Sequence, residues 1–235
     1  MEPAISSSRA PQVGAHAALV LARSRILENP YLISLADGSM TRAMFQASQE
    51  QFFFAVTFFP RPMAALVGRI EDPHLRLDIL GNLVEEHGDF NASAFHHNTF
   101  KRFLASINAK AESLDALDLW PEVRAFNSVL TASCVLDEFE VGIGCMGIIE
   151  HAFAGIPAVI GNAVVTHGWV DREQLVHYKL HAAIDERHAD EFYAVVEPRW
   201  NEPSRRYLII QGLELGAYIF DRLYRDLLRR SRQLQ

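Results

Sequence analysis

Apolar residues recur at the three-and-four spacing of amphipathic helices along nearly the whole chain, and no convincing alternating stretch indicates a β-strand. Proline, glycine and capping residues divide this pattern. Asp72-Pro73, for example, combines an N-cap with a proline at the first helical position. Asp171 is another clear start, because Gln174 completes a capping box with it. The predicted helices cover 14–27, 40–57, 73–87, 94–107, 121–135, 139–153 (running on irregularly toward 165), 171–196 and 204–235.

Seven or eight helices in 235 residues predict a single all-α helical bundle without a second domain. We take the domain as 1–235, with 1–12 as a flexible N-terminal segment. Helical bundles place cofactors between facing helices. Polar residues on inward faces are therefore the candidates for chemistry.

Composition narrows the partners. The 22 basic and 29 acidic residues leave a formal net charge of −7, which disfavours nucleic-acid binding. Cys134 and Cys145 cannot build a disulfide scaffold, and their isolation suggests a reducing compartment. The longest apolar stretch, 141–165, is interrupted by glycines and by Glu150 and His151, which favours a buried helix over a membrane span.

The first dozen residues do not have the pattern of a signal peptide. We therefore expect a cytoplasmic protein that acts on a small-molecule substrate, with neither nucleic acid nor membrane as a partner. A homodimer is compatible with the sequence, which does not determine the oligomeric state.

The strongest local signal is a group of three polar residues, His181, Asp185 and His188, at spacings of four and three. On a helix these positions share one face. Imidazole nitrogen and carboxylate oxygen are ligands that suit iron, manganese or zinc. Glu186 and Arg187 lie nearby, so an ordinary solvated face is the alternative to a metal site.

A second signal combines Glu86 with His96. The helical phase puts Glu86 on the apolar face of its helix, pointing inward, and Glu85 on the outward face. His96 follows ten residues later, beyond Gly88, so the two side chains can meet only if the helix bends or unwinds between them. The alternative is a surface pair of glutamates followed by loop histidines.

A third signal is Glu150, whose helical neighbours are all apolar or small. A buried carboxylate needs a partner, because an isolated buried ion is very costly. No lysine or arginine occurs between Arg124 and Arg172, so a bound metal would supply the positive charge. A protonated or hydrogen-bonded Glu150 is the alternative.

A fourth carboxylate, Glu50, shares a helix face with Phe53 and Phe54. It is a candidate auxiliary metal ligand or substrate contact. A hydrogen bond with Gln46, one turn earlier, or a place at the rim explains it equally well.

The order of these residues resembles that of the haem-oxygenase-like di-iron oxidases: a glutamate, a histidine ten residues on, a glutamate 54 residues further, then His-x₃-Asp-x₂-His. The phrase N-L-V-E-E-H-G-D-F-N at 82–91 is also similar to the third-helix signature of that family. The resemblance extends over roughly 26–197. It implies a haem-oxygenase-like fold holding two iron ions, with Glu50 as an extra candidate beside the ligands Glu86, His96, Glu150, His181, Asp185 and His188.

The same resemblance implies that O₂ is a co-substrate and that the carboxylates of Glu86, Glu150 and Asp185 serve catalysis, since they tolerate a changing charge on iron. Reactions of the family include N-oxygenation, desaturation and oxidative C–C cleavage of amino acids or fatty acids. We expect a small amino-acid-like metabolite in a biosynthetic pathway. An apolar lining would exclude water, and its candidates are Phe52, Phe53, Phe54, Phe58, Phe59 and Met146.

Other functions stay open. Thiaminase II and pyrroloquinoline quinone synthase C have the implied fold without a metal, and Cys134 would be the nucleophile of a thiaminase II-like enzyme. A further branch makes p-aminobenzoate from its own tyrosine and lysine. Here no lysine lies between Lys110 and Lys179, so we do not expect that activity. A non-catalytic helical interaction protein is the remaining alternative.

Overall fold

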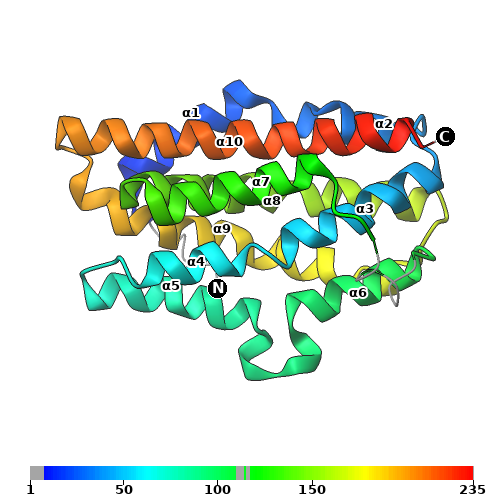
Figure 1. Cartoon of the computed structure of the whole chain (residues 1–235), viewed down its shortest axis with the longest axis horizontal. Coiled ribbons are helices and arrows are strands. Elements are labelled where there is room, and N and C mark those ends of the chain that lie inside the picture. Colours follow the sequence, from blue (N-terminus) through cyan, green and yellow to red (C-terminus); the bar gives the residue numbers. More distant parts are fainter. Residues whose placement is uncertain (1–7, 110–113, 115–116, 235) are drawn as a thin grey trace, which may run out of the picture.

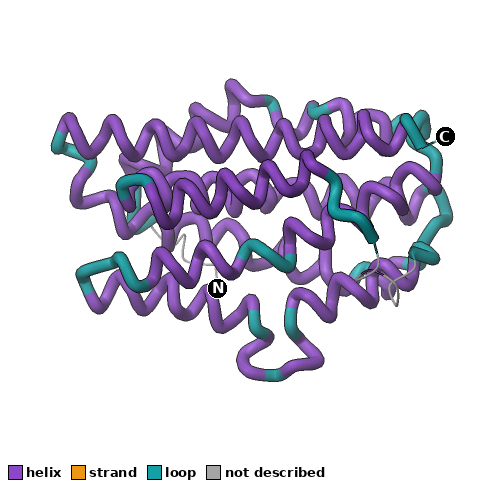
Figure 2. The backbone as a smooth tube through the Cα atoms, in the orientation of Figure 1, coloured by secondary structure: helices purple, strands orange, loops and turns teal. Residues whose placement is uncertain are grey.

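The computed structural model describes residues 8–109, 114 and 117–234, apart from the side chains of 176, 177 and 179–186. Within this part of the chain every regular element is a helix, which confirms the all-α prediction (Figures 1 and 2). The α-helices are α1 (Pro11–Ser24), α2 (Pro30–Ala36), α3 (Arg42–Val56), α4 (Pro60–Val67), α5 (Pro73–Glu86), α6 (His96–Ser106), α7 (Pro121–Thr131), α8 (Phe139–Thr166), α9 (Val176–Val196) and α10 (Pro203–Arg232).

Proline sets where most of these helices begin. It occupies the first helical position of α1, α2, α4, α5, α7 and α10, where its missing N–H would have no partner in any case. Asp72 caps α5 as predicted, its carboxylate accepting from the backbone N–H of His74 at 2.8 Å. Asn29-Pro30 was expected to end a helix, but Asn29 instead caps the short helix α2. Pro60 likewise begins α4, and these two short helices add to the seven or eight expected.

Helix α8 runs through the core, packed along α9 on one side and α10 on another. It is one helix of 28 residues that continues past Pro157, rather than the shorter helix with an irregular extension that the sequence predicted. By length and hydropathy alone it could cross a membrane, but 72% of its most apolar window is buried inside the fold.

Glycines allow α8 and α10 to approach each other closely. A Cβ added at Gly212 would lie 2.3 Å from the carbonyl oxygen of Val141. One added at Gly144 would lie 2.8 Å from the carbonyl oxygen of Ile209. Because these neighbours are backbone atoms, they cannot move aside as a flexible side chain could.

The N-terminal segment is anchored where it is described. Residues 1–7 lie outside the described part of the chain. From Ser8 onward, however, the segment expected to be flexible is held to α9 and its end. The Ser8 hydroxyl and the Arg9 backbone N–H both donate to Asp190, Ala10 is fully buried, and the backbone N–H of Gln12 donates to Glu197.

Replacing Gly212 by alanine should therefore lower the free energy of unfolding by about 1–3 kcal/mol, because the added methyl forces α10 away from α8. Urea unfolding of the purified protein measures it. Gly81→Ala is the matched control: that glycine lies within α5 with no atom within 4 Å of an added Cβ. The control should be neutral or stabilising by up to about 1 kcal/mol. Equal stabilities of the two variants would contradict the close approach.

Candidate metal centre

The turn between α5 and α6 brings Glu86 and His96 together. After α5 ends, Gly88, Asp89 and Phe90 all have positive φ angles, between 52° and 66°, and the chain reverses through two 3₁₀ turns. This turn projects from the lower edge of the bundle in Figure 1. An added Cβ at Gly88 would lie 2.5 Å from the carbonyl carbon of Ala94, so only glycine fits without a shift of the backbone.

The result is a direct contact between two buried polar side chains. The Glu86 carboxylate Oε1 lies 2.9 Å from Nδ1 of His96, and the two residues are 6% and 2% exposed. The inward orientation predicted for Glu86 and the unwinding predicted between the two residues are both confirmed. Their role as metal ligands stays a prediction.

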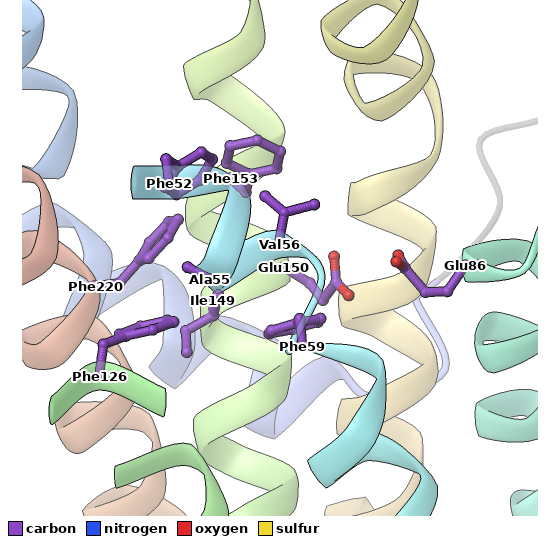
Figure 3. A pocket seen from close by; sticks show the side chains of 10 residues that line it. All are labelled: Phe52, Ala55, Val56, Phe59, Glu86, Phe126, Ile149, Glu150, Phe153 and Phe220. Atoms are coloured by element: carbon purple, nitrogen blue, oxygen red, sulfur yellow. The ribbon is translucent and has the colours of Figure 1, made fainter. Parts of the chain in front are cut away.

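Glu150 reaches the same place from α8. It is 4% exposed and lines a cavity of about 50 Å³ together with Glu86. Figure 3 shows the two carboxylates pointing toward each other from α8 and α5. We call this the carboxylate cavity; its lining consists of Phe52, Ala55, Val56, Phe59, Glu86, Phe126, Ile149, Glu150, Phe153 and Phe220.

The wall of the carboxylate cavity is apolar apart from the two glutamates. Phe52 and Phe59, two of the aromatic residues expected there, do line it. Phe53 instead packs against His97 and Phe100, and Met146 is buried elsewhere in the core. The aromatic lining that would exclude water is thus present, but part of it comes from later helices.

Helix α9 packs against both α5 and α8, the helices that carry Glu86 and Glu150. Its backbone is helical through His181 and Asp185, but the side chains of these two predicted ligands lie outside the described residues. His188 is described and is fully buried. Within the described side chains, no group of three or more His, Cys, Asp or Glu residues is arranged to hold a metal ion. A complete centre therefore needs a contribution from α9.

His188 contacts Glu85 rather than Glu86. Its Nε2 lies 3.0 Å from a carboxylate oxygen of Glu85, and a guanidinium nitrogen of Arg187 lies 2.5 Å from the same oxygen. Burial alone would raise the pKa of the Glu85 carboxyl, but the hydrogen bonds from Arg187 and His188 outweigh it and hold that pKa below its ordinary value. Glu85, predicted to face solvent, is therefore an ionised link between α5 and α9.

A buried network fastens the first turn of α9 to α3. The hydroxyl of Tyr178 donates to Oε1 of Gln49 at 2.5 Å, and Nε2 of Gln49 donates to the Tyr31 hydroxyl at 2.8 Å. The sequence reasoning did not find this network. A polar Gln49 on the otherwise apolar side of a predicted helix was the available signal.

Glu50 takes the less specific of its predicted roles. It is half-buried and accepts a hydrogen bond from Nε2 of Gln46 at 3.3 Å. It does not line the carboxylate cavity. Its position supports a structural role and leaves the metal to the other residues.

Cys134 is poorly suited to act as a nucleophile. It is fully buried, and burial raises the pKa of its thiol to about 12 even though Ser133 lies within hydrogen-bond reach. Because the thiolate is the reactive form, this environment makes the sulfur inert at neutral pH. The thiaminase II-like alternative therefore lacks its expected reactive group at this position.

The described donors fit iron by their chemistry. Two carboxylates and one imidazole, all buried, border one small cavity at the meeting point of α5, α6 and α8. Oxygen and imidazole nitrogen are the donors found in non-haem iron sites, and helical bundles build such sites from facing helices. Glu86, His96 and Glu150 are placed to hold metal from one side, with α9 facing them.

Comparisons with known proteins agree with this arrangement. The sequence profile of a family described as iron-containing redox enzymes matches residues 46–219. The chain is 24% identical over 198 residues to a 4-aminobenzoate synthase from Nitrosomonas europaea, covering 80% of this chain and 79% of that protein.

Solved structures agree on the fold. A protein of unknown function with a haem-oxygenase-like fold from Shewanella denitrificans superposes with a TM-score of 0.73 at 16% identity, over 96% of this chain and 92% of that one. A TenA homologue from Pseudomonas syringae superposes with a TM-score of 0.75 at 16% identity, over 99% and 98% of the two chains. The fold is thus haem-oxygenase-like, and because the profile match spans most of its length, the chain belongs to the family of iron-containing redox enzymes.

Proposed function

We propose that this protein is a non-haem di-iron oxidase that uses O₂ to oxidise a small amino-acid-like metabolite. One observation carries the proposal: Glu86 and Glu150, from two different helices, point toward each other into one apolar cavity, with His96 in contact with Glu86. The proposed ligands are Glu86, His96, Glu150 and His188 with His181 and Asp185 of α9.

Each described residue has a physical task in this proposal. Iron bound here would supply the electrons that reduce O₂ and the oxidising power used on the substrate. Glu86 and Glu150 provide negative charge that stabilises bound cations in a poorly solvated cavity. His96 adds a neutral donor, and Glu85 orients the buried imidazole of His188 through its Nε2. The phenylalanine wall keeps water away from the reacting atoms.

The proposal differs from the activity named for the curated relatives, 4-aminobenzoate synthase. No lysine occurs between Lys110 and Lys179. Lys101 lies with its Nζ 5.7 Å from the centroid of the Phe53 ring, and Phe53 is not among the residues that line the carboxylate cavity. We therefore favour an external substrate over a side chain of the protein itself.

Anaerobic titration should load about two Fe(II) per chain. Glu86→Gln should lose much of one equivalent and abolish iron-dependent O₂ consumption, because it removes a charged donor from the cavity. Glu85→Gln should keep both equivalents but weaken binding by about tenfold, because it only loosens the orientation of His188. Iron content and O₂ uptake of each purified variant measure these effects.

Glu71→Gln is the control for charge removal, since Glu71 is exposed at the opposite end of the α5 region and should behave as wild type. If Glu85→Gln lost an equivalent while Glu86→Gln bound normally, the roles of the two glutamates would be exchanged. Iron binding near zero in the unmodified protein would reject the proposal as a whole.

The α5–α6 turn provides a test that leaves every donor in place. Gly88→Ala should weaken Fe(II) binding by about tenfold, because its Cβ would push Ala94 and so separate His96 from Glu86. Gly168→Ala is the matched control: its φ of 65° imposes similar backbone strain, but no atom lies within 4 Å of the added Cβ. Both variants should lose about 1–2 kcal/mol of stability, and only the first should lose iron affinity. Equal iron affinities would contradict the role assigned to the turn.

A further inference from the structure

A polar pocket lies beside the metal centre, where the end of α3 and the start of α4 face α7. It has a volume of about 340 Å³. Two arginines border it, and none of its described lining residues is acidic. We call it the arginine pocket; its polar lining consists of Thr57, Arg61, Arg124, Asn127, Ser128 and Thr131.

The charge of this pocket is opposite to that of the whole chain, which is −7. Neither Arg61 nor Arg124 forms an ion pair with an acidic side chain in the part of the chain that the structure describes. Arg61 lies over the ring of Phe58, with 5.7 Å from its Cζ to the ring centroid, a contact that positions the guanidinium without using its N–H groups. Two guanidiniums on one hollow form a receptor for a carboxylate, which arginine binds through paired hydrogen bonds.

Asn127 provides a second, independent sign of a ligand. Its side chain is more than nine-tenths buried, and its Nδ2 donates to the carbonyl oxygen of Phe54 at 3.3 Å. That bond fixes the orientation of the amide, because a carbonyl oxygen can only accept. Its Oδ1 is buried and has no hydrogen-bond partner among the described residues. A buried acceptor left unsatisfied is costly, so an N–H donor of a ligand would stabilise it.

The arginine pocket is continuous with the metal centre. Thr57 and Arg61 also line a groove of about 340 Å³ that contains Glu86 and His96. We call it the side groove. Glu86 and Val56 in turn belong to both the side groove and the carboxylate cavity. A ligand held by the arginines can therefore extend through the side groove toward Glu86.

We propose that the arginine pocket binds the head group of an α-amino acid. Arg61 and Arg124 hold its carboxylate, and Oδ1 of Asn127 accepts a hydrogen bond from its amino group. The side chain of the ligand runs along the side groove, so that its distal carbons reach the apolar carboxylate cavity. This assignment rests on the proposed function for the reaction, but the head-group site itself stands on the geometry of the pocket.

Three matched probes separate the contacts: L-2-aminooctanoate, octanoate, which lacks the amino group, and heptylamine, which lacks the carboxylate. Calorimetric titration of the full chain, with and without anaerobic Fe(II), measures the affinity of each. Arg61→Gln and Arg124→Gln should each weaken both acids by about tenfold and leave heptylamine unchanged. Asn127→Leu should weaken L-2-aminooctanoate by a similar factor and leave octanoate unchanged.

Arg206→Gln is the control, because Arg206 is an exposed arginine of α10 outside these hollows. The inference is overturned if neither acid binds at about 10 mM, or if both arginine variants bind the acids as tightly as Arg206→Gln does. Binding of the acids only when Fe(II) is present also overturns it, because the carboxylate would then sit on the metal.

The two proposals fail differently. A chain that takes up no iron but binds the acids through Arg61 and Arg124 would refute the oxidase and retain the head-group site. A chain that binds two irons and consumes O₂, with no arginine dependence in acid binding, would refute the head-group site alone.

Discussion

The structure depends on placing carboxylates inside an apolar bundle. Transferring a carboxylate from water to a protein interior costs several kcal/mol or more unless hydrogen bonds or a cation compensate it. Glu86 and Glu150 are both nearly inaccessible and share a cavity walled by phenylalanines. An arrangement that concentrates negative charge where water cannot reach it is expensive for stability alone. It is what a site for multivalent cations requires, and this explains why the bundle is organised around it.

Close helix packing makes that cavity possible. Gly144, Gly212 and Gly216 let α8 and α10 touch through their backbones, which holds α8 at the centre of the bundle. On another face of α8, an added Cβ at Gly147 would lie 2.8 Å from the side chains of Phe192 and Tyr193, so α9 approaches equally closely. Gly147 precedes Glu150 by about one turn. The glycines thus set the distance between the helix that carries Glu150 and the helix that carries His188.

Helix starts could be predicted from the sequence because their signals are local. Asp72-Pro73 begins α5 where expected, and the Asp171–Gln174 capping box is present, although it caps a 3₁₀ turn just before α9. Asn29-Pro30 shows the limit of such signals, since a capping residue followed by proline can close one helix or open the next. The inward direction of Glu86 also followed from local periodicity.

Contacts between helices could not be predicted in the same way. Helical phase says which face a residue occupies, but not which helix lies opposite it. Glu85 was therefore expected to face solvent, although it meets His188 and Arg187 of α9. Arg61 and Asn127 carry no sequence signal of a shared pocket, because they are 66 positions apart and meet only through the packing of α7 on α3.

The way α9 is held bears on how the centre can form. Metal ligands from separate helices bind well only when packing and outer hydrogen bonds hold each in place. Here Tyr178 fastens the start of α9 to Gln49 of α3, and Arg187 fastens its later part to Glu85 of α5. His181 and Asp185 lie between these two anchors in the sequence. The anchors are independent of any metal, so the bundle presents α9 to Glu86 and Glu150 before an ion binds. A ligand set spread over four helices can then act as one site, because the cost of bringing the helices together has been met by the fold.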